Sequence, residues 1–187
     1  MKYIILDTET AGLPICKGFG NYYDPKQFDT YYNKCRLVEL GYIVFEDDVE
    51  ILRYESIVIP VDFTINNSNY HHITTEKATL EGHPLTDVLD QLTKDIEGCS
   101  LIVGHNINFD IHIVLAEAYR TKSDKLVGLI KGTKSFCTMN YGKTAMGFRK
   151  VPKLTELYEY LHNEPLKQDH RALSDVLATA SCYTKLK

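Results

Sequence analysis

The chain has 187 residues and an ordinary composition, with 44% hydrophobic and 25% charged residues. This length and composition fit one compact domain spanning residues 1–187, and they exclude a disordered, collagen-like or disulfide-rich protein. The net charge of −4 does not by itself indicate a nucleic-acid-binding protein. No apolar run reaches the roughly 18 residues that a membrane span needs, and the N-terminus is too polar for a signal peptide. We therefore expect a soluble, cytoplasmic protein.

The first part of the chain is predicted to form strands. Residues 2–6 are a short apolar run typical of a buried strand. Residues 36–45 and 51–59 are two further strand candidates, and the acidic stretch between them favours a hairpin turn. Residues 14–35 have no clear period and predict a long loop. Three consecutive strands of this kind predict an antiparallel meander.

In the rest of the chain, helical patterns alternate with short strands. Helices are expected over residues 84–96, 109–119, 153–161 and 171–183, and strands over residues 100–103 and 135–137. Asn106 or Asn108 is expected to cap the second of these helices, and Pro152 fits the first turn of the third. Strands followed by alternating helices and strands predict an α/β fold, in which helices cover a mixed sheet.

Basic residues are concentrated in one segment. Residues 120–153 hold nine lysines and arginines and a single acid, Asp124. One interpretation is a solvated, lysine-rich surface. The other is a surface that holds the phosphates of a nucleic acid. Composition alone does not separate the two.

The first motif with chemical content is Asp7-Thr8-Glu9. Residues i and i+2 of a strand point to the same face, so both carboxylates would project together from the end of the first strand. Two adjacent carboxylates raise each other's pKa, and a divalent cation that prefers oxygen ligands relieves the repulsion. A solvated strand end is the competing interpretation.

Two further acids stand at helix starts or on helix faces. Asp110 ends the run Gly-His-Asn-Ile-Asn-Phe-Asp, where the helix dipole favours its charge. Asp175 is expected on the inward face of the last helix, where an acid needs a partner such as a metal ion. His170, five residues earlier, would lie at the start of that helix, either over the same site or as a surface cap.

Together these motifs resemble the DEDD-type 3′–5′ exonucleases, in the subgroup whose last motif carries a histidine. The motifs stand here as LDTETAGLP, VGHNINFD and HRALSDVLATA, in the family's order and spacing. Relatives include the epsilon proofreading subunit of DNA polymerase III, ribonuclease T and the three-prime repair exonucleases. The resemblance implies a ribonuclease-H-like fold, with helices flanking a mixed five-stranded sheet.

The resemblance also implies a role for each matching residue. Asp7, Glu9 and Asp175 would hold a first metal ion, Asp7 would bridge to a second, and Asp110 would contribute directly or through water. The ions would be two Mg²⁺ or Mn²⁺. His170 would be the general base that activates water. The product would be a nucleoside 5′-monophosphate released from a 3′ end.

Substrate-binding positions follow from the same resemblance. The residues implied at the terminal nucleotide are Thr8, Thr10, Ala11, Leu13, His71 and Asn106. Leu13 would wedge beside the last base, or instead anchor its loop to the core. His71 would contact the terminal sugar, although the adjacent His72 makes the assignment ambiguous. The loop over residues 15–34 is longer than in compact relatives, and its tyrosines either stack on bases or pack the loop onto the sheet.

The expected partner is single-stranded DNA or a frayed DNA 3′ end. RNA is an alternative substrate, because the 2′-OH is read by details of the pocket that the motifs do not specify. A binding module that has lost catalysis is a second alternative, but all five catalytic positions hold the required residue types. Association with a polymerase is a further option, although no tail beyond the last expected helix is available for it.

Overall fold

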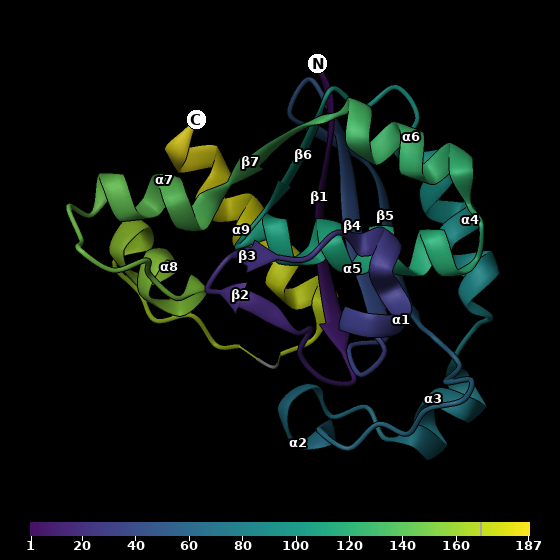
Figure 1. The fold of residues 1–187 in the computed structure, drawn as a ribbon. Coiled ribbons are helices and arrows are strands. Elements are labelled where there is room, and N and C mark those ends of the chain that lie inside the picture. Colours follow the sequence, from purple (N-terminus) through teal and green to yellow (C-terminus); the bar gives the residue numbers. More distant parts are fainter. Residues whose placement is uncertain (169) are drawn as a thin grey trace.

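A five-stranded mixed sheet forms the centre of the computed structural model, which describes residues 1–168 and 170–187 (Figure 1). The strand order is β5-β4-β1-β6-β7. The strands are β1 (Lys2–Thr10), β4 (Leu37–Glu46), β5 (Val49–Ile57), β6 (Leu101–Gly104) and β7 (Lys134–Cys137). β4 is antiparallel to β1 and β5, whereas β6 is parallel to β1 and to β7. The predicted mixed sheet and antiparallel meander are confirmed.

Helices pack on both faces of this sheet (Figure 1). The main core cluster joins β1 and β4 to α4 (Leu85–Asp95), α5 (Ile107–Arg120) and α6 (Asp124–Gly132). On the opposite face a second cluster joins β1 and β4 to α9 (Ala172–Leu186). α7 (Thr138–Ala145) and α8 (Leu154–His162) in turn contact α9.

Alternation along β1 decides which side chains meet which helices. Ile4 and Leu6 belong to the cluster with α5, whereas Tyr3 and Ile5 belong to the cluster with α9. The strand continues past residue 6 to Thr10, so it is longer than predicted, and Asp7 and Glu9 lie within it. Because the period of a strand is two, Asp7 and Glu9 continue the face toward α9.

The segment over residues 14–35 has more structure than the predicted loop. It contains β2 (Cys16–Gly18), β3 (Asn21–Tyr22), the 3-10 turn Pro25–Gln27 and α1 (Phe28–Tyr31). Tyr32 is fully buried, and Tyr23 stacks on Tyr31 with ring centroids 3.7 Å apart. Tyr31 and Tyr32 therefore pack this segment onto the main core cluster, and Tyr23 packs on Tyr31.

Four helices outside residues 14–35 were not predicted, and the side-chain cap expected for α5 is absent although Asn106 stands at the N-cap position. The unpredicted helices are α2 (Ser68–His71), α3 (Thr75–Glu81) and α7, in addition to α6. Asn106 stands at the N-cap of α5, but its φ is 67° and its side chain makes no capping bond. Asn108 instead donates to the carbonyl of Gly20 at 2.8 Å. Within the residues described, no helix is long and apolar enough to cross a membrane.

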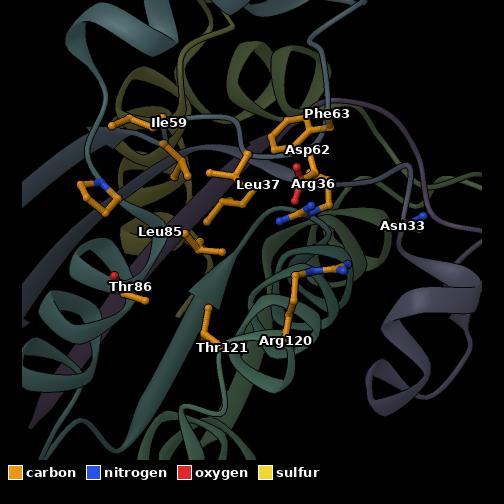
Figure 2. Close-up of a pocket in the computed structure, with 13 residues that line it drawn as sticks. Asn33, Arg36, Leu37, Ile59, Asp62, Phe63, Leu85, Thr86, Arg120 and Thr121 are labelled. Carbon is orange, nitrogen blue, oxygen red and sulfur yellow. The ribbon is translucent and has the colours of Figure 1, made fainter.

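Glu117 joins α5 to the start of β4. Its Oε1 accepts from Arg36 Nε at 2.7 Å and from the amide of Leu37 at 3.2 Å, and its Oε2 accepts from Arg120 Nε at 3.0 Å. Both arginines line a cavity of about 740 Å³, which Figure 2 shows together with Phe63. None of the site residues predicted from the sequence lines this cavity, so we assign the Glu117 cluster to stability.

Replacing Glu117 with alanine should lower the free energy of unfolding by about 3–5 kcal/mol, because two mostly buried guanidinium groups lose their counter-ion. Urea denaturation measures the change. Asp29→Ala is the control, since Asp29 also pairs with Arg120 but its side chain is 79% exposed. It should cost less than about 1 kcal/mol. Equal losses for both variants would contradict the assignment.

Candidate active site

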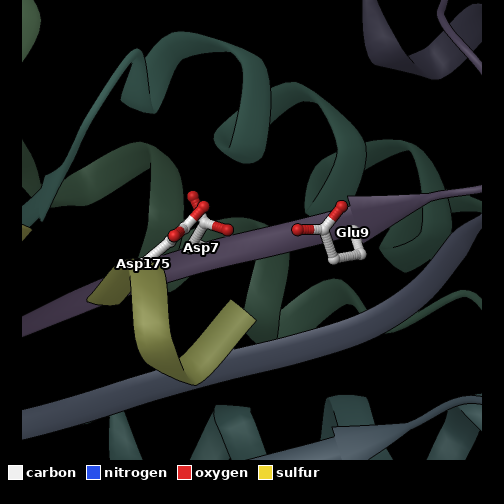
Figure 3. A group of neighbouring side chains, drawn as sticks. All are labelled: Asp7, Glu9 and Asp175. Carbon is white, nitrogen blue, oxygen red and sulfur yellow. The ribbon is translucent and has the colours of Figure 1, made fainter. Parts of the chain in front are cut away.

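Three carboxylates from two distant parts of the chain meet on the α9 face of the sheet. Asp7 and Glu9 come from β1, and Asp175 comes from the first turn of α9 (Figure 3). One oxygen from each lies within 4.8 Å of the others. Carboxylate oxygens at this spacing are the ligands that Mg²⁺ and similar hard cations take. The donor set therefore fits a divalent metal ion.

A glycine in β4 allows α9 to come close enough for this meeting. Gly41 is the partner of Asp7 in the β1–β4 ladder. A Cβ atom at Gly41 would lie 2.7 Å from backbone atoms of both Ala172 and Leu173, which is too close for any other residue type. The absence of a side chain at Gly41 thus positions the first turn of α9, and with it Asp175, beside Asp7.

The start of α9 is also held by a buried glutamate. Glu39 is the ladder partner of Glu9 and has no exposed surface. Both of its oxygens accept from Arg171 Nε at 3.0 Å, and one accepts from the amide of Ala172 at 3.0 Å. Sequence reasoning missed Glu39 and Gly41. The available signal was a glutamate and a glycine inside the otherwise apolar run of residues 37–45.

Asp110 approaches from the other face of the sheet. It lies in the first turn of α5 and is 2% exposed. Its Oδ1 accepts from the amide of Thr8 at 3.0 Å and from Thr8 Oγ1 at 2.7 Å. The ladder between β1 and β6 extends only to Ile5. Beyond it the amide of Thr8 has no partner in β6, and it donates to Asp110 instead. Asp110 is therefore fixed to the strand that carries Asp7 and Glu9.

Crowding and burial raise the pKa values of these acids. Burial, and then the charges of Asp110 and Asp175, raise the pKa of Asp7 well above its usual range. Burial, and then the charge of Asp175, raise the pKa of Glu9 to about 8. Burial raises the pKa of Asp110 to about 7, against the lowering effect of its bonds from Thr8. A bound divalent cation would reverse these shifts by favouring the charged forms.

The stability of the metal-free protein should therefore fall as the pH rises. A carboxyl with a raised pKa in the folded state binds more protons there than in the unfolded chain, so its stabilising contribution is lost as the pH passes its folded pKa. For Glu9 and Asp110 this window runs from about pH 4 to about pH 8. Urea denaturation in EDTA across this range measures the slope, and saturating Mg²⁺ should flatten or invert it. If Asp7→Asn and the parent protein show the same dependence of stability on pH in EDTA, the crowded carboxyl groups are not its cause.

The structure leaves His170 outside the carboxylate cluster. His170 is exposed, has a φ of 52° and precedes α9 by two residues. Within the part of the chain that the structure describes, His170 makes no hydrogen bond or ion pair. Asp175 instead accepts from Gln168 Nε2, at 2.8 Å and 2.7 Å to its two oxygens. Sequence reasoning had not singled out Gln168.

Most of the predicted substrate-binding residues border one pocket. Thr8, Thr10, Leu13 and His71 line a cavity of about 530 Å³, together with Glu9, Gly12, Asn67, Tyr70 and Phe109. His71 is buried and His72 is exposed, so His71 is the histidine that reaches the pocket. Asn106 lines an adjacent pocket that also contains Leu13. Ala11 packs against a small core cluster and borders a different cavity.

The mixed sheet with helices on both faces is the ribonuclease-H-like fold of exonucleases. A family model described as exonuclease, that of ribonuclease T, matches residues 4–183. The chain therefore belongs to this exonuclease family. Curated protein sequences contain no match to it.

Solved structures of exonuclease I share this fold. Escherichia coli exonuclease I in complex with a dT13 oligonucleotide superimposes with a TM-score of 0.76 at 16% identity, over 99% of this chain and 40% of that one. A product-bound exonuclease I gives a TM-score of 0.75 at 16% identity, over 100% and 43% of the two chains. The zinc-bound complex of the E. coli enzyme with single-stranded DNA gives 0.76 at 17% identity, over 99% and 40%. The chain thus spans about two fifths of the length of these exonuclease I chains.

Proposed function

We propose that residues 1–187 act as one exonuclease domain, which hydrolyses phosphodiester bonds at 3′ ends of nucleic acids and releases nucleoside 5′-monophosphates. The observation that carries the proposal is the meeting of Asp7, Glu9 and Asp175 beside the pocket that contains His71. Single-stranded DNA is the favoured substrate, since the exonuclease I structures with this fold hold DNA oligonucleotides.

In this proposal Asp7, Glu9 and Asp175 would hold one divalent cation, and Asp7 with Asp110 would help to hold a second. Two Mg²⁺ or Mn²⁺ ions would stabilise the attacking and leaving oxygens of an in-line displacement. His170 takes the proton from the attacking water, a task that suits an imidazole near neutral pH. His170 is exposed and lies two residues before the helix that carries Asp175.

The terminal sugar would be recognised by a donor and an acceptor in the pocket. His71 Nδ1 accepts from the amide of Ile73 at 3.2 Å, so the neutral ring carries its proton on Nε2. Burial lowers the pKa of His71 and favours this neutral form. Nε2 of His71 and Oδ1 of Asn67 are both buried without a hydrogen-bond partner among the described residues. A sugar hydroxyl that accepts from His71 and donates to Asn67 would satisfy both atoms.

The basic segment would hold phosphates upstream of the cut. Lys143 lies on α7, and Arg149 and Lys150 are exposed between α7 and α8, which pack around the helix that carries Asp175. Replacing all three with glutamine should weaken strand binding and reduce the salt dependence of the affinity by about one unit of log–log slope per lost phosphate contact. Fluorescence anisotropy over a salt series measures both. Lys94→Gln on α4 is the control, and a triple variant with an unchanged slope would remove this role.

The direct test is digestion of end-labelled strands. Single-stranded DNA, duplex DNA and single-stranded RNA of matched sequence are each incubated with Mg²⁺, Mn²⁺ or EDTA. We expect a ladder that shortens from the 3′ end, a mononucleotide product, and no reaction in EDTA. Single-stranded DNA should react fastest, and faster cleavage of RNA would assign the protein to the exoribonucleases. If no strand is shortened in either metal, the proposal fails and an end-binding module is the function left.

A further inference from the structure

The Asp175 carboxylate has a close partner in the segment before α9. Gln168 Nε2 donates to both of its oxygens, at 2.8 Å and 2.7 Å. Gln168 lies between α8 and α9 and is half-buried. A single amide nitrogen thus spans the whole carboxylate, as a cation does when both oxygens of a carboxylate bind it.

This contact reaches the oxygen that would hold a metal ion. One oxygen of Asp175 lies within 4.8 Å of an oxygen from Asp7 and one from Glu9. Because Gln168 donates to both oxygens of Asp175, it donates to that one, whichever of the two it is. A residue that only supports a metal ligand would bond the oxygen that the metal leaves free. The bond pattern therefore indicates competition with a metal ion rather than support for it.

The electrostatics of the amide agree with this interpretation. The NH₂ group of a glutamine carries positive partial charge, so at hydrogen-bond distance from an oxygen it repels a cation that approaches the same oxygen. The amide has no net charge, so a divalent cation attracts the crowded carboxylates more strongly than the amide does. A cation would therefore displace the amide, but its observed affinity would be lowered by the stability of the contact that is lost.

We infer that Gln168 is a built-in competitor for the divalent cation that the proposed function places on Asp7, Glu9 and Asp175. At low metal concentration its amide holds Asp175, and at high metal concentration it gives way. Gln168 thereby sets the metal concentration above which the proposed nuclease is active. This inference rests on the proposed function, because it needs a carboxylate cluster that takes a cation.

The test changes the amide without removing any proposed ligand. Titration calorimetry measures the dissociation constant of Mn²⁺ in the absence of nucleic acid, at one fixed pH. Gln168→Met keeps the length of the side chain but has no N–H to donate, and it should tighten Mn²⁺ binding roughly three- to thirty-fold. Gln168→Lys keeps a donor and adds a positive charge, so it should bind Mn²⁺ more weakly than the parent protein.

Gln91→Met is the matched control. Gln91 on α4 donates to Asp95 Oδ2 at 2.9 Å, so this variant loses the same kind of contact outside the carboxylate cluster. It should leave the dissociation constant of Mn²⁺ unchanged. Urea denaturation in EDTA reports on the Gln168 contact itself, and Gln168→Met should lower the free energy of unfolding there. An unchanged free energy of unfolding would mean that the contact is absent in solution, which overturns the inference.

Unchanged Mn²⁺ binding by Gln168→Met would also overturn the inference, and weaker binding would make Gln168 a support of the metal site instead. Failure of the proposed function is seen separately, in the parent protein. A parent protein that binds Mn²⁺ and trims 3′ ends, with an affinity that neither Gln168 variant changes, loses only the competitor. A parent protein that binds Mn²⁺ but trims no strand keeps the competitor if Gln168→Met binds more tightly. A parent protein that binds no Mn²⁺ would overturn both.

Discussion

Asp7→Asn should abolish 3′ trimming. Asp7 is the carboxylate at which Glu9, Asp175 and Asp110 converge, since each of the three raises its pKa. In the proposed mechanism Asp7 would help to hold both metal ions, and an amide in its place would remove the charge that attracts them. A loss of several kcal/mol of transition-state stabilisation lowers the rate on the order of a thousandfold or more. Digestion of end-labelled DNA in saturating Mg²⁺ measures it.

The same variant should fold normally and be more stable than the parent protein in EDTA. Asparagine keeps the shape of the side chain but removes one of several crowded negative charges. Urea denaturation in EDTA tests this second expectation, and Mg²⁺ should stabilise the variant less than the parent protein. Asp90→Asn, on the exposed side of α4, is the control and should change neither property. Full activity of Asp7→Asn would refute the metal site.

His170→Ala should slow hydrolysis by roughly a hundred- to ten-thousandfold while metal affinity stays unchanged, because a general base contributes about that factor and no proposed ligand is lost. The rate is followed by single-turnover digestion, and metal affinity by titration of the stability in Mg²⁺. The pH–rate profile of the variant should lose the limb that belongs to deprotonation of the histidine.

The comparison variant is His162→Ala, at the end of α8, where the ring bonds Ser181 and lies outside the candidate site. It should leave the rate and the pH–rate profile as they are. A His170→Ala protein with an unchanged rate would exclude His170 as the base. A parallel loss of metal binding would instead make His170 a ligand or a residue that positions one.

Local patterns in the sequence predicted those parts of the site that depend on a single element. Strand alternation predicted that Asp7 and Glu9 share a face, and Asp175 was expected on the inward face of its helix. Both expectations agree with the geometry. The mixed sheet was predictable because long apolar runs with period two and helical stripes determine elements and layers.

Features that depend on contacts between distant elements were not predictable. Glu39 and Gly41 position the start of α9, and this role follows only from the packing of α9 on β4. No local periodicity in the sequence indicates that packing. The helices α2 and α3 are 4 and 7 residues long, too short to form without their tertiary contacts. Asn106 occupies the N-cap position of α5 but makes no capping bond. Asn108 lies within the helix and bonds Gly20 in the hairpin of β2 and β3, a contact that spans 88 positions.

The proposed ligand set would also make activity depend on completion of the fold. Asp7 and Glu9 lie at the beginning of the sequence and Asp175 on the helix that packs last in chain order, so no contiguous stretch of chain carries the cluster. During synthesis, the strand that bears the first two acids would emerge long before the third. An unfinished or locally opened chain could not assemble the three oxygens, so the proposed nuclease activity would begin only once α9 had docked against Gly41.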